Sequence, residues 1–278
     1  MRILGDTLAE ESLLKYYERH IKELTKRLRR VFVTWFVSIL LFISFPASVL
    51  NLETFLSGEY VPLAVFIVER VSNYVLQSSL LSNARVVFIA ERLNVGFELW
   101  FLSAFVLSLL VAIPVLLFEI WRFIEPGLYE HEKKAFKKAF VPIVGSFMGG
   151  CLFGYFILVP IILRAFLAIM SWFNIQPMVS YMDFIAFILS TVVFSGIFMV
   201  TPFIIYVLIS VGLIPVEPFI KYRAPIYVAI YVIAAIITPD GGSMGSAILA
   251  IPIIVLFEIV IQLAKRKASE KGRSCCRQ

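Results

Sequence analysis

LWFLSAFVLSLLVAIPVLLFEIW, residues 99–121, contains a single charged side chain, Glu119. A helix that spans a bilayer needs roughly 20 consecutive apolar residues, and this run is long enough. We find further runs of this kind at about 31–50, 139–163, 184–212, 222–238 and 244–263. The chain is therefore predicted to be an all-α integral membrane protein with six transmembrane helices.

The composition supports this class. Of the 278 residues, 60% are apolar and 16% are charged, and the mean hydropathy is +0.93. Soluble globular chains have about 45–50% apolar and about 25% charged residues, so these values exclude a soluble domain, a disordered chain and a nucleic-acid-binding domain. Cys151, Cys275 and Cys276 have no metal-ligand spacing. No nucleotide-binding, zinc-protease or esterase motif is found. We expect no enzyme activity, metal or cofactor.

The basic residues predict the orientation. Most of the 25 lysines and arginines lie in the N-terminal segment, in the loops after the second and fourth spans, and in the tail. The alternate loops contain only Arg70, Arg85, Arg92 and Arg164. Basic loops remain cytoplasmic, so both termini are predicted to be cytoplasmic. Residues 1–263 would form one membrane domain that begins with a cytoplasmic helix over 1–30, and 264–278 would be a basic cytoplasmic tail.

The first outer loop, about 51–98, is long. Its apolar run at 61–68 is too short to span a membrane and stops at Glu69 and Arg70. We interpret it as an amphipathic helix at the membrane interface. The fifth and sixth spans are also short. Seventeen helical residues reach only about 25 Å, which predicts local thinning of the bilayer beside them.

Several acidic residues have two readings from sequence alone. Glu23 and Arg27 lie four apart on an amphipathic helix, either as an ordinary ion pair or as part of a binding site. Glu132 is either a charged loop tip at the headgroups or a functional acid. Asp240 fits a tight turn. Glu258 lies inside the sixth span, where it either is functional or bonds the neighbouring backbone.

Glu119, at the inner end of its span, is expected to extend to the headgroups.

Four stretches, in chain order, carry a resemblance to a known family. They resemble the motifs of TatC, the multi-spanning receptor subunit of the twin-arginine protein translocase. The stretches are HIKELTKRL (20–28), FEIWRFIEPGLYEHEKKAF (118–136), FMGGCLFGYFILVP (147–160) and ITPDGGSMGSAILAIPIIVLFE (237–258).

The resemblance implies a cupped, glove-like bundle in the cytoplasmic membrane. It implies binding of signal peptides with two adjacent arginines, on folded cargo, with transport driven by the proton-motive force. Single-span TatA- and TatB-type proteins are the implied partners, and a homo-oligomer is expected in the assembled complex.

Site residues follow from the same resemblance, position by position. Those implied in signal-peptide binding are Glu23, Arg27, Phe123, Pro126, Tyr129, His131 and Glu132. Those implied in contact with a partner helix are Thr201, Thr238 and Ser246. Those implied in the outer loops are Pro62 and Asp240.

The chain departs from the family in its fourth span. Two residues before Pro202 the family usually has glutamate or glutamine, and here the residue is Val200. The nearest polar side chain is Thr201. The sequence therefore predicts no buried acid at this position.

Three other classes stay open from sequence. A small-molecule secondary transporter would be expected to have inverted repeats and charged pairs at the bilayer midplane, and neither is found. An intramembrane enzyme would need paired acids or a nucleophile at depth, where Glu258 stands alone. A purely structural scaffold would bind nothing through its N-terminal helix or the Glu132 loop.

Overall fold

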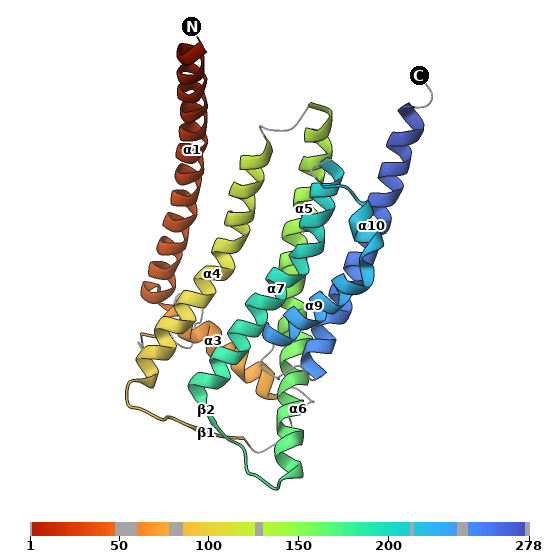
Figure 1. Ribbon diagram of the computed structural model, residues 1–278. Helices are drawn as coiled ribbons and strands as arrows, with labels where there is room; N and C mark the ends of the chain where they lie inside the picture. The colour runs from red at the N-terminus through yellow and green to blue at the C-terminus, as the bar shows by residue number, and fades with distance from the viewer. Residues whose placement is uncertain are drawn as a thin grey trace.

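The computed structural model describes residues 2–47, 60–77, 86–125, 130–211, 214–237 and 244–275, and side chains over most of these. The helices are α1 (Arg2–Ser44), α3 (Leu63–Gln77), α4 (Val95–Ile124), α5 (Glu130–Phe153), α6 (Val159–Trp172), α7 (Tyr181–Val211), α8 (Glu217–Lys221), α9 (Arg223–Ile237) and α10 (Met244–Cys275). A π-helical turn η3 (Gly154–Leu158) and two strands, β1 (Val87–Ile89) and β2 (Met178–Ser180), complete them. Figure 1 shows both termini at one end of the bundle and α3, β1 and β2 near the other.

Four of the described helical segments are long and apolar enough to cross a membrane. They are Val95–Phe123, Phe140–Trp172, Tyr181–Ser210 and Gly245–Lys265. A shorter apolar helix covers Arg223–Ile236.

The first expected span differs from its predicted bounds. α1 continues unbroken through residue 30, and its apolar part ends at Ser44 rather than near residue 50. Pro46 explains this end, because a proline disfavours helical conformation in the residue before it.

α7 lies at the centre of the packing. Ile185 and Ile188 of α7 join a buried cluster with α3 and α4, and Val193 joins another with α4 and α5. Met199 packs in a third cluster that includes residues of α9 and α10. Since lipid tails are as apolar as these side chains, close packing rather than hydrophobic segregation must hold the helices together.

Glycines at the end of α5 and the start of η3 allow a close approach to α7. A Cβ on Gly154 would lie 2.0 Å from Oγ of Ser195, and one on Gly150 would lie 2.8 Å from Cα of Gly196. The Ser195 hydroxyl donates a hydrogen bond of 2.8 Å to the carbonyl of Gly150. Only glycines allow two backbones this close, so this contact sets the position of α5 against α7.

The third apolar segment runs through α5, η3 and α6. The amide of Val159 donates to the carbonyl of Gly154, five residues earlier, which is the π-helical pattern. Pro160 follows directly, and a proline has no amide hydrogen and clashes with the carbonyl four residues before it. A single π turn accommodates that clash without ending the helix.

The segment between α1 and α4 contains the expected amphipathic helix, α3. It is longer than the apolar run, because Ala64, Val68, Ser72 and Val75 form a buried face at helical spacing while Glu69 lies on the exposed face.

This loop is tied to the rest of the bundle at two points. Pro62 and Pro46 form an isolated antiparallel bridge, so Pro62 joins the start of α3 to the end of α1. β1 pairs in parallel with β2, with Phe88 opposite Val179. The bridge and the strand pair fix the end of the molecule that lies away from the two termini.

Candidate functional site

A charged cluster lies where α1 meets α4, at the end of the bundle that contains both termini. Glu23, Arg27 and Arg30 share one face of α1, and Glu119 and Phe123 share one face of α4, because residues three or four apart on a helix are neighbours. The two faces meet through an ion pair that joins residues 89 positions apart.

Glu119 is the centre of this contact. Nη1 of Arg30 donates to Oε1 of Glu119 at 3.1 Å and lies 3.4 Å from Oε2, and Nη1 of Arg27 lies 3.8 Å from Oε2. The Glu119 side chain is only 9% exposed. Its carboxylate therefore binds α1, and its expected extension to the headgroups stays a prediction. A buried carboxylate needs a partner, and α1 supplies two guanidinium groups.

Arg27 lies between two carboxylates and an aromatic ring. It forms a hydrogen-bonded ion pair with Glu23, so the predicted four-residue pair is present. Its guanidinium carbon lies 5.8 Å from the centre of the Phe123 ring, within range of a cation–π contact. The Arg27 side chain is 13% exposed and that of Glu23 is 41% exposed. Glu23 is thus the accessible carboxylate of the cluster.

A cavity of about 400 Å³ opens beside these residues. Five of its six lining residues are basic. The lining consists of Lys22, Glu23, Lys26, Arg27, Arg30 and Arg122. This cavity is called the basic pocket below.

Several predicted site residues lie elsewhere. α5 begins at Glu130, so His131 and Glu132 occupy its first turn, where carboxylates are favoured by the helix dipole, but their side chains lie outside the described ones. Four further predicted residues lie outside the described part of the chain: Pro126, Tyr129, Thr238 and Asp240.

Two residues implied in partner contact differ in accessibility. Ser246 is fully buried, whereas Thr201 is exposed. Val200, at the position of the missing acid, is buried in the cluster that includes Trp121 and Phe147. The structure thus fills this position with apolar packing.

Glu258 bonds side chains of the neighbouring helix. Arg223 of α9 donates to its Oε1 at 2.9 Å, and the Tyr227 hydroxyl donates to its Oε2 at 2.5 Å. Both of these partners are side chains, whereas one of the two readings from sequence had Glu258 bond the neighbouring backbone. The three side chains join α9 to α10.

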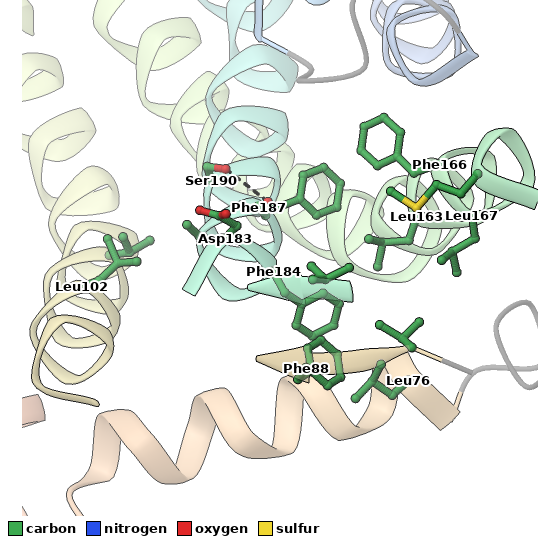
Figure 2. Close-up of a pocket in the computed structure, with 15 residues that line it drawn as sticks. Leu76, Phe88, Leu102, Leu163, Phe166, Leu167, Asp183, Phe184, Phe187 and Ser190 are labelled. Carbon is green, nitrogen blue, oxygen red and sulfur yellow. Dashed lines mark hydrogen bonds between the residues drawn. The ribbon is translucent and has the colours of Figure 1, made fainter. Parts of the chain in front are cut away.

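A second cavity, of about 810 Å³, lies toward the other end of the bundle. Figure 2 shows side chains of α3, β1, α4, α6 and α7 around it, among them Phe88, Phe166 and Phe187. Asp183 and Ser190 are polar, and Ser190 donates to the carbonyl of Phe187 at 3.1 Å. The lining suits an apolar chain. This cavity is called the apolar pocket below.

The contact of Arg30 with Glu119 was missed by sequence reasoning. A signal for it exists, because an acid inside an otherwise apolar helix requires a partner. The sequence does not say which basic residue supplies it.

Comparisons with known proteins agree on one family. The family model "Sec-independent protein translocase protein (TatC)" matches residues 19–252. TatC of Aquifex aeolicus is 39% identical over 163 residues, which cover 58% of this chain and 67% of that protein. TatC of Listeria innocua is 25% identical over 245 residues, or 87% of this chain and 88% of that one.

A solved structure agrees with these relatives. A crystal structure of the twin-arginine translocase receptor TatC in the detergent DDM has a TM-score of 0.70 and 29% identity, and the match covers 88% of this chain and 99% of that one. TatC proteins are membrane components of a protein translocase rather than enzymes. On these matches, the chain belongs to the TatC family of Sec-independent protein translocase proteins.

Proposed function

We propose that this protein is the receptor for paired-arginine signal peptides on folded cargo, with six spans in the cytoplasmic membrane and both termini cytoplasmic. The observation that carries the proposal is the accessible carboxylate of Glu23 in the charged cluster between α1 and α4. Glu132, in the first turn of α5, is the second carboxylate. Two guanidinium groups of a signal peptide would pair with these two acids.

The chemistry favours arginine over lysine. A guanidinium presents a planar fork of donors that matches a carboxylate, whereas an ammonium is a point charge. A hydrogen bond to a charged group contributes about 1.5–3 kcal/mol, against about 0–1 kcal/mol for an exposed ion pair. Because α1 and α4 partly shield Glu23 from water, we expect the free energy of its pairing with a signal arginine to lie between these two ranges.

In the free protein, Glu23 already forms a hydrogen-bonded ion pair with Arg27. Nη1 of Arg27 also lies 3.8 Å from Oε2 of Glu119. Arg27 would therefore still have one carboxylate partner when an arginine of the signal peptide binds Glu23. Glu119 therefore lowers the free-energy cost of replacing Arg27, as the partner of Glu23, by an arginine of the signal peptide.

The apolar segment of the signal peptide would lie along exposed apolar helix faces and reach the apolar pocket. Its aromatic and aliphatic lining, with only Asp183 and Ser190 polar, supports this placement. Asp183 lies in the first turn of α7, at the rim toward the outer end.

Single-span TatA- and TatB-type partners would pack on α9 and α10, in an assembly that contains several copies of this chain and uses the proton-motive force. α9 has 15 residues and spans only about 22 Å. A thinned bilayer beside it is expected, and its exposed Val232, Ile233 and Ile236 offer an apolar face.

The test is binding of a twin-arginine peptide to the purified protein in nanodiscs, beside the same peptide with two lysines. We expect wild type to prefer the arginine peptide, and Glu23→Gln and Glu132→Gln each to remove that preference in a folded protein. Glu217→Gln, which changes an exposed acid of α8, is the matched control and should bind as wild type does. Equal binding of both peptides to wild type would refute the site.

A further inference from the structure

The charge around the proposed receptor site is unfavourable for its own ligand. Lys22, Lys26, Arg27, Arg30 and Arg122 line the basic pocket, and the acids among them are Glu23 in the lining and Glu119 behind it. A signal peptide with two arginines would approach a region with more positive than negative charge. An additional negative group would remove this repulsion.

The basic pocket lies at the height where lipid headgroups are expected. On α1, Arg30 is the last charged residue before the apolar part that ends at Ser44. On α4, Arg122 follows the apolar run and lies in the last turn of the helix. Basic pockets between helices at such a boundary bind the phosphates of anionic lipids.

The pocket has the room and the donors for a phosphate group. At about 30 Å³ per water molecule, its volume of about 400 Å³ is that of about a dozen waters. Nε of Arg27, which lines it, is buried and has no hydrogen-bond partner within the described residues, and Nη1 has only the longer contact of 3.8 Å with Glu119. Glu23, the one acid in the lining, is already paired with Arg27.

The surface of α1 that continues from the basic pocket toward Ser44 suits acyl chains. Val33 and Val37 continue the helix face of Lys26 and Arg30, at spacings of three and four residues along α1. Both valines are exposed. A lipid with its phosphate in the pocket would therefore lay its chains along apolar side chains of the same helix.

We propose that the basic pocket binds the phosphate of an anionic phospholipid, which supplies negative charge next to Glu23. The effect on signal-peptide binding rests on the function proposed above, whereas the lipid site itself does not. The lipid is a structural partner of the receptor, and its headgroup lowers the repulsion that the signal arginines meet.

The first experiment measures lipid retention without any peptide. The protein is placed in nanodiscs of phosphatidylcholine with a minor fraction of phosphatidylglycerol, and the phosphatidylglycerol that stays bound after transfer to detergent is counted by native mass spectrometry. Each basic residue near a lipid surface contributes about 1 kcal/mol, or about fivefold, so Lys26→Gln with Arg122→Gln should weaken retention about thirty-fold. Lys221→Gln with Lys265→Gln removes the same charge elsewhere and should retain lipid as wild type does.

Equal retention by the pocket variant and the control variant would overturn the proposal. Inorganic phosphate tests the other source of the same chemistry. If it binds the protein in pure phosphatidylcholine as tightly as phosphatidylglycerol does, with the same loss in the pocket variant, the ligand is the free ion and the lipid assignment is wrong.

The second experiment measures the affinity of the twin-arginine peptide in the two nanodisc compositions. We expect tighter binding with phosphatidylglycerol for wild type and for the control variant, and no lipid dependence for the pocket variant. A lipid dependence that persists in the pocket variant would refute the link to Glu23. Absence of any twin-arginine preference in wild type would refute the proposed receptor function and leave the lipid retention result standing.

Discussion

Replacing Glu119 with glutamine should loosen α1 from α4. The substitution keeps the shape of the side chain and removes the charge that two arginines share. Arg30 can turn toward water, because its side chain is 47% exposed, but Arg27 is 13% exposed and keeps only Glu23 as a charged partner. The perturbation therefore falls mainly on the contact between the two helices.

The magnitude follows from the distances and the burial. At an effective dielectric constant of about 20, unit charges separated by the 3.1 Å between Arg30 and Glu119 attract by about 5 kcal/mol before desolvation is counted. Exposed pairs retain about 0–1 kcal/mol of such attraction, while breaking a buried pair costs about 3–5 kcal/mol. Since only one partner here is buried, we expect a loss of about 2 kcal/mol.

A double-mutant cycle of Glu119→Gln and Arg30→Gln measures this energy. Unfolding is followed in detergent by the fluorescence of tryptophans, one of which, Trp121, is buried close to Glu119 in α4. The matched control is the cycle for Arg92 and Glu98, whose charges lie 3.9 Å apart and are much more exposed. A coupling energy no larger than that of the control pair would refute the claim that Glu119 holds the two helices together.

Three further predictions test other parts of the molecule. Gly154→Ala, which brings a Cβ against Ser195, should destabilise the fold by about 1–3 kcal/mol in the same assay, whereas Gly149→Ala, with nothing within 4 Å, should not destabilise it. Ala186→Trp, which fills the apolar pocket, should weaken binding of the whole signal peptide without changing the ratio between arginine and lysine peptides. A cysteine in place of Ile236, which is 77% exposed, should crosslink to a single-span partner, and capture of none would contradict docking on α9.

The positions of the helices follow from sequence because apolar runs and proline have local consequences. The bounds of α4 lie within a few residues of those predicted for its span. The first span is the exception, because hydropathy continues past Ser44 while Pro46 ends the helix. Hydropathy reports which residues avoid water and does not report where backbone hydrogen bonding stops.

The contacts between helices do not follow from sequence in the same way. The pairing of Arg30 with Glu119 depends on the rotation of α1 against α4, which is set by packing along their whole length. The Gly154 approach to Ser195 likewise depends on how α5 and α7 cross. Spacing rules identify which residues share a face of a helix. Several basic residues of α1 share the face of Arg30, so the sequence does not say which of them pairs with Glu119.

Val200 leaves the middle of its apolar segment without an acid, because its side chain is buried in an apolar cluster. Within the described parts of the four long apolar segments, Glu119 and Glu258 are the acids away from the helix ends near β1 and β2, and each one already binds an arginine. The two acids therefore join helices, Glu119 joining α4 to α1 and Glu258 joining α10 to α9.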